Sequence, residues 1–110
     1  MTYTEVAQMI AGTGIANAYY QFTQDTAVPP PFICFFFTDS ADLAADDTNY
    51  VKVRPLAIEL YTDTKDFDLE AVVENALNAN GLVYEREETP LDSERMYMVV
   101  FRTTVIIQED

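Results

Sequence analysis

The stretch ELYTDTKDFDLE, residues 59–70, decides the fold because it joins a strand pattern to a helix pattern. Leading into it, Leu56, Ile58 and Leu60 alternate with other residues, as apolar side chains do in a half-buried strand. The junction itself holds acids, threonines and Lys65, and it lacks the glycine, histidine or nucleophile motifs that hold ligands at such junctions in α/β enzymes. We therefore expect the function to reside on surfaces. Beyond the junction, apolar residues recur at helical spacing, at Leu69, Val72, Val73, Ala76 and Leu77.

The chain has 110 residues, of which 49% are apolar, and it contains seven tyrosines and seven phenylalanines. This length and composition predict one folded domain over residues 1–110, because the aromatic surface offsets the entropy lost on folding. The longest strongly apolar run, residues 29–37, is far shorter than the roughly 20 residues of a membrane helix. We expect no membrane segment, and a buried, inert thiol at Cys34 in a protein that folds in the cytosol.

The chain contains no histidine, which excludes Ser-His and Cys-His nucleophile pairs and a His-ligated zinc site. We expect no enzyme activity, no catalytic residue, no cofactor and no metal. Paired carboxylates are the enzymatic alternative, either Asp66 with Asp68 or Glu87 with Glu88, but adjacent acids in turns are more often solvated caps. A calcium loop is the alternative for residues 39–49, but this segment lacks the D-x-[DN]-x-[DN]-G pattern and its final glutamate.

Element patterns predict an α+β fold in the order α-β-β-β-α-β-β, with a mixed, mostly antiparallel sheet and both helices packed on one face. Helices are expected over residues 5–10, capped by Thr4, and from Asp66 or Asp68 to Asn80 and Gly81. The polar connections are residues 39–49 and 87–93. Strands are expected over residues 16–22, 32–38, 50–61, 82–85 and 95–107.

Two details of this pattern concern strand phase and helix faces. In the strand over 50–61, Pro55 is expected to shift the alternation, with a bulge or an edge position at Arg54 and Pro55. In the main helix, Glu70, Glu74 and Asn75 are expected on the polar face.

Nineteen acidic and six basic residues give a formal charge of −13, which repels the phosphate backbone of nucleic acids. We therefore expect no specific DNA binding. An acidic surface around an opening would let DNA pass without adhering. The same charge leaves open an acidic decoy that mimics DNA and inhibits a nucleic-acid enzyme.

Four segments carry a resemblance that spans nearly the whole chain: GTGIANAYYQF (12–22), PPPFICFFF (29–37), IELYTDTKDFDLEAVVENAL (58–77) and YEREETPLDSERMYMVVF (84–101). With these segments the chain resembles the tail terminator, or tail completion (head–tail joining), family of siphophages and prophages of Gram-positive bacteria. The resemblance implies a lambda-like tail terminator fold and a non-enzymatic virion structural protein. It further implies assembly in the host cytoplasm into a ring, usually hexameric, at the head–tail interface.

The partners implied by this resemblance are further copies of the chain, the major tail tube protein and the head–tail connector or stopper protein. DNA would pass through the ring without specific binding. A head-side stopper or a minor capsid component shares the same features and stays open as an alternative.

Two groups of residues are predicted to serve such an assembly. The first is a subunit interface formed by residues of the apolar and basic strands, although burial in the chain's own core and pairing within the chain stay open. It comprises Phe35, Phe37, Lys52, Arg54 and Arg102. The second consists of acids expected in loops that face the lumen or the tube, namely Asp39, Asp42, Asp46, Asp47, Glu87, Glu88 and Asp92.

Overall fold

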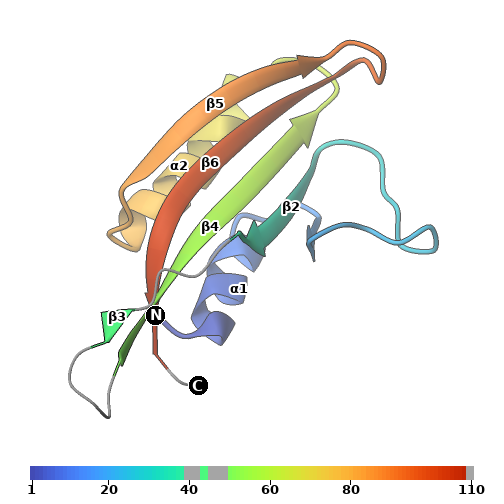
Figure 1. Ribbon diagram of the computed structural model, residues 1–110. Coiled ribbons are helices and arrows are strands. Elements are labelled where there is room, and N and C mark those ends of the chain that lie inside the picture. Colours follow the sequence, from blue (N-terminus) through green and yellow to red (C-terminus); the bar gives the residue numbers. More distant parts are fainter. Residues whose placement is uncertain (39–42, 45–49, 109–110) are drawn as a thin grey trace.

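The computed structural model describes residues 1–38, 43–44 and 50–108 and contains two helices on one side of a curved sheet (Figure 1). The α+β class is confirmed, and the predicted order is interrupted only by one additional two-residue strand. In chain order the elements are α1 (Tyr3–Ala11), β1 (Asn17–Tyr19), β2 (Phe32–Phe37), β3 (Leu43–Ala44), β4 (Tyr50–Thr62), α2 (Phe67–Ala79), β5 (Tyr84–Leu91) and β6 (Met96–Ile107).

The sheet runs in the spatial order β1-β2-β4-β6-β5, and β3 pairs with β4 beside this path. Only β1 and β2 are parallel; the other pairs are antiparallel, which confirms the predicted mixed sheet. Because side chains alternate between faces, one face of the sheet receives Ile33, Ile58 and Phe101, which are fully buried under the helices.

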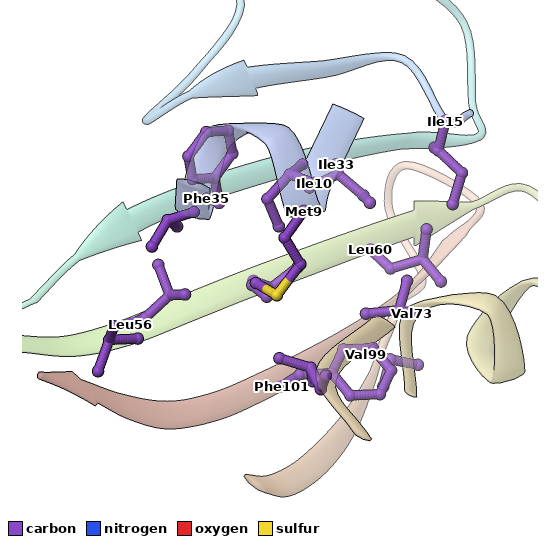
Figure 2. Packing of buried hydrophobic residues seen from close by; sticks show 14 of the residues in the cluster. Met9, Ile10, Ile15, Ile33, Phe35, Leu56, Leu60, Val73, Val99 and Phe101 are labelled. Carbon is purple, nitrogen blue, oxygen red and sulfur yellow. The ribbon is translucent and has the colours of Figure 1, made fainter. Parts of the chain in front are cut away.

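The hydrophobic core lies between this face and the two helices, and Figure 2 shows its side chains pointing toward one another. Val6, Met9 and Ile10 come from α1, and Val73 and Leu77 come from α2. The strands contribute Ile33, Phe35, Leu56, Ile58, Leu60, Val99, Phe101, Val105 and Ile107.

Helix α1 starts at Tyr3, two residues before its predicted start at Glu5, and its cap is not the predicted Thr4. Thr2 is the N-cap: its hydroxyl accepts a hydrogen bond from the Glu5 amide at 3.0 Å, and the Glu5 carboxylate accepts one from the Thr2 amide at 2.9 Å. This reciprocal pair is a capping box, which the Thr-x-x-Glu spacing encodes. The predicted cap at Thr4 is wrong because Thr2, three residues before Glu5, has the spacing of the capping box and Thr4 does not.

Helix α2 begins and ends where the sequence predicts. The Asp66 carboxylate accepts a hydrogen bond from the Leu69 amide at 3.0 Å and caps the first turn. At the other end, Gly81 has a φ of 68°, and the Leu82 amide donates to the Leu77 carbonyl at 3.0 Å. Glycine is required here because only it adopts this left-handed conformation without strain.

Strand β4 pairs with β6 in one unbroken register, from Lys52 opposite Ile107 to Thr62 opposite Tyr97. The predicted bulge and change of phase at Arg54 and Pro55 are therefore wrong. Pro55 fits because its carbonyl accepts from the Thr38 amide at 3.0 Å, so its missing N–H faces the end of β2 and not β6.

The strand boundaries differ from the predictions in two other places. The segment 87–93, predicted as a turn, is largely strand, because β5 extends from Tyr84 to Leu91 and the turn lies at 92–95. Glu87 and Glu88 have low strand propensity, but their pairing with the long strand β6 outweighs it. Strand β1 is shorter than predicted because Tyr20, with a φ of 72°, leaves the extended conformation.

We expect the two faces of the sheet to respond differently to truncation. Leu60→Ala removes a fully buried side chain and should lower the free energy of unfolding by about 2–5 kcal/mol. Ile106→Ala is the matched control, because Ile106 is 58% exposed, and its effect should stay within about 0.5 kcal/mol. Urea unfolding of both variants measures the difference, and equal losses would contradict the assigned faces.

Candidate functional site

Among the described residues, no group of histidine, cysteine, aspartate and glutamate side chains has the arrangement of a metal site. None of the helices there is long and apolar enough to cross a membrane. Two features of the surface bear on function: an ion network between α2 and β5, and the sheet face that the helices leave uncovered.

The ion network is centred on Glu70, whose side chain is buried in the first turns of α2. One of its carboxylate oxygens binds Lys65 and the other binds Arg86 of β5. Lys65 also pairs with Glu88, and Arg86 reaches Glu74 at 3.4 Å. The expectation that Glu70 lies on a polar, solvent-facing side of the helix is wrong, because two cations compensate its charge inside the fold.

The network also shifts the proton affinities of its members. Desolvation lowers the pKa of Lys65, but its hydrogen bonds to Glu70 and Glu88 outweigh this effect and leave the pKa raised. The hydrogen bond to Glu70 raises the pKa of Arg86. The Tyr84 hydroxyl donates to Glu74 at 2.7 Å, and this bond raises the pKa of the phenol. The network therefore fastens α2 to β5.

The second feature is the sheet face opposite the helices, called here the open face. By strand alternation it includes Phe32, Cys34 and Phe36 of β2 together with Glu59 and Tyr61 of β4. The Phe32 and Tyr61 rings stack with centroids 4.8 Å apart. Over β2 and β4 this face is aromatic around the carboxylate of Glu59, which accepts a hydrogen bond from the Tyr61 hydroxyl at 2.9 Å.

A groove of about 520 Å³ lies on the open face, between these strands and the segment 20–31, called here the arm. The arm leaves the edge of the sheet after β1 and returns to β2 (Figure 1). Its first residues pack on β2: the ring centroids of Tyr20 and Phe36 lie 5.4 Å apart, and those of Phe22 and Phe32 lie 5.5 Å apart. The groove is lined by Tyr20, Gln21, Phe22, Ala27, Val28, Phe32, Cys34, Phe36, Glu59 and Tyr61.

Charge and burial within the groove shift two pKa values in the same direction. Burial raises the pKa of the Cys34 thiol, and the charge of Glu59 raises it further. Burial also raises the pKa of Tyr61, with the hydrogen bond to Glu59 adding to the effect. The free thiol of Cys34 is buried, as the sequence predicts.

The residues predicted for a subunit interface do not form one cluster. Phe35 is only 7% exposed and belongs to the core, and Phe37 packs edge-on against Tyr3, with ring centroids 5.3 Å apart. The Arg54 guanidinium donates to the Tyr3 hydroxyl at 3.3 Å. Lys52 lies two residues before Arg54 and pairs with Ile107 of β6.

Arg102 lies apart from these residues, on the open face of β6, where its guanidinium is 3.7 Å from the Glu87 carboxylate. The interface prediction as such stays a prediction.

The acids predicted to face the lumen also separate. Glu87 and Glu88 lie in β5 and not in a loop, and Glu88 takes part in the ion network. Asp92 is exposed in the turn 92–95. Asp39, Asp42, Asp46 and Asp47 lie outside the described residues.

Sequence reasoning missed the groove. The signal that could have indicated it was the row of alternate residues Ala57, Glu59 and Tyr61, which places a carboxylate among aromatic side chains on the second face of a long strand. The position of the arm over that face was not encoded in any local pattern.

Neither the family models nor the curated protein sequences match this chain. Among solved structures, a chain in the virion of a native gene transfer agent (GTA) particle is similar to this one. It is 21% identical with a TM-score of 0.56, and the alignment covers 91% of this chain and 85% of that one. The two chains share the fold over nearly their whole length.

We expect the buried ion network to carry more stability than exposed charges of the same helix. Glu70→Gln leaves Lys65 and Arg86 without their central anion and should lower the free energy of unfolding by about 3 kcal/mol. Asp68→Asn, an exposed acid in the same first turn, is the control and should cost less than about 1 kcal/mol. If chemical denaturation gives equal losses for both variants, Glu70 does not anchor α2.

We also expect the folded chain to lose stability at alkaline pH. Because the pKa of Tyr61 is raised by folding, its contribution is complete below the ordinary tyrosine pKa of about 10 and is lost as the pH rises through that value toward the folded-state pKa. Tyr61→Phe removes this ionisation and should move the alkaline unfolding midpoint to higher pH. Circular dichroism during a pH titration measures the midpoint, and Tyr20→Phe is the exposed control. An unchanged midpoint for Tyr61→Phe would contradict this linkage.

Proposed function

We propose that this chain is a non-enzymatic structural protein of a phage-like virion, where it forms a ring that caps the tail tube and joins it to the head connector. The likeness in fold to a chain of a gene transfer agent virion is the observation that carries this proposal. The sequence resemblance to tail terminators points to the same class and implies a position at the tail end and a ring that is usually hexameric.

The form of the chain supports a role in assembly. The molecule is elongated, with extents of 51 × 29 × 24 Å, and its long strands leave the open face uncovered by any helix (Figure 1). Large apolar side chains are exposed away from the core, including Phe67 at 71% and Val83 at 89%. Phe67 lies at the start of α2 and Val83 beyond its end, so the chain offers separate apolar points at which other virion proteins could pack.

The charge of the chain supports the passage of DNA. A ring of chains with a formal charge of −13 each offers no phosphate-neutralising contacts, so a duplex in the opening would not release counterions and would not adhere. The ion network leaves two of the basic residues, Lys65 and Arg86, facing carboxylates of the same chain.

A head-side stopper is the second candidate function, because the description of the similar structure names a virion and gives no position within it. Crosslinking in intact particles separates the two functions. A crosslink to the major tail tube protein supports the terminator, whereas a crosslink only to portal or capsid proteins supports the stopper.

We expect the purified chain, mixed with tail tubes from the parent particle, to form closed rings at the tube ends. Light scattering measures the mass of the complexes, and electron microscopy of the tube ends gives the number of subunits, which should be six. The chain alone and the tubes alone are the controls. A chain that stays monomeric and never appears at tube ends would overturn the proposal, as would retention of duplex DNA by the rings at physiological salt.

A further inference from the structure

The groove on the open face contains a negative charge that the described part of the chain leaves without a cation. Glu59 is half-buried among Phe32, Cys34 and Phe36, and among the described residues its hydrogen-bond donor is the neutral Tyr61 hydroxyl. A carboxylate in such surroundings gains strongly from a nearby guanidinium or ammonium group. The raised pKa values of Cys34 and Tyr61 agree with a charge that acts through an apolar environment.

The walls of the groove are held in place before any partner arrives. Tyr20 and Phe22 pack against the phenylalanines of β2, and the Thr26 hydroxyl accepts from the Thr23 amide at 2.9 Å within the arm. A segment fixed in this way loses little entropy when it binds a partner.

One exposed cation of the chain suits this groove. Arg95 lies in the turn 92–95 between β5 and β6, with a φ of 55°, and makes no ion pair with any described residue. Lys65, Arg86 and Arg102 already face carboxylates of their own chain. Lys52 and Arg54 lie at the far end of β4, where Arg54 binds Tyr3.

The surroundings of Arg95 also match the groove. Leu91 and Met96, both half-buried, flank the turn with apolar surface. Asp92 and Glu94 are exposed in the same turn, and at the rim of a contact their charges would remain in water, where salt screens them.

The groove lies on the open face over β2 and β4, and the turn lies at the opposite, β5, edge of the sheet, but both are at the same end of the strands. The arm lies beside β1 and β2, whereas the turn joins β6 to the other edge strand, β5. The register fixes the level: Phe32 pairs with Tyr61, and the adjacent Thr62 pairs with Tyr97 beside the turn. Figure 1 shows the arm and the turn at the end of the sheet where β4 terminates.

A contact between two different patches, one on the open face and one at the β5 edge, is heterologous, and such contacts close into a ring when the rotation between subunits allows it. We propose that the groove binds the turn 92–95 of a second copy of the chain, and that Arg95 of that copy pairs with Glu59. This inference rests on the proposed ring and specifies its subunit contact.

The test uses charge reversal in ring assembly on tail tubes. Arg95→Glu should weaken association between subunits by at least about tenfold, because it places a second carboxylate against Glu59. Glu59→Arg should weaken it similarly, and the double variant Arg95→Glu, Glu59→Arg should restore association. Glu94→Gln, in the same turn, is the control and should leave association nearly unchanged. Circular dichroism verifies that each variant is folded.

A crosslinking experiment gives a test that does not depend on charge. In a Cys34→Ser background, Val28→Cys on the arm and Ser93→Cys in the turn should give a ladder of disulfide-linked oligomers on oxidation, and either cysteine alone should not. If Arg95→Glu forms rings normally and the variant with both cysteines gives no ladder, this contact is overturned while the proposed function stands. Absence of rings from the unmodified chain on tail tubes would overturn both.

Discussion

The pairing of β4 with β6 is the constraint on which the rest of this structure depends. The two strands stay in register from Lys52 to Thr62, so every even-numbered residue of β4 faces the helices and every odd-numbered residue faces the other side. A shift of the β4 register by one residue would move Leu56, Ile58 and Leu60 from the buried face to the open face. The core and the groove are therefore opposite sides of the same alternation.

The chain has six basic residues and nineteen acids, so only some of its carboxylates can have a cationic partner within the chain. Two cations are used within the fold, where Lys65 and Arg86 enclose the buried Glu70 and hold α2 against β5. A buried carboxylate without these partners would be strongly destabilising. Glu59, on the other face, has only a neutral hydrogen-bond donor among the described residues. Its charge is therefore the basis for proposing a cation from a second copy of the chain.

Local signals predicted the elements well where one interaction dominates. Asp66 and Gly81 set the ends of α2 because a cap and a left-handed glycine act within one turn. They failed where partners distant in the sequence decide. Glu87 and Glu88 are residues typical of a turn, yet they pair with β6. Pro55 indicates a break in the strand, but its missing N–H faces the end of β2, so the pairing with β6 continues. The capping box at Thr2 was available locally and was missed.

Composition, spacing and periodicity in the sequence are enough to establish the α+β class, one helix before the strands and one within their series, the lack of histidine chemistry and the acidic surface. Which acids are buried, which face of the sheet stays open and which residues line the groove depend on contacts between distant segments. Glu70 and Glu59 look alike in a sequence of nineteen acids. They differ because strand pairing and helix packing bring two cations to one and aromatic rings to the other.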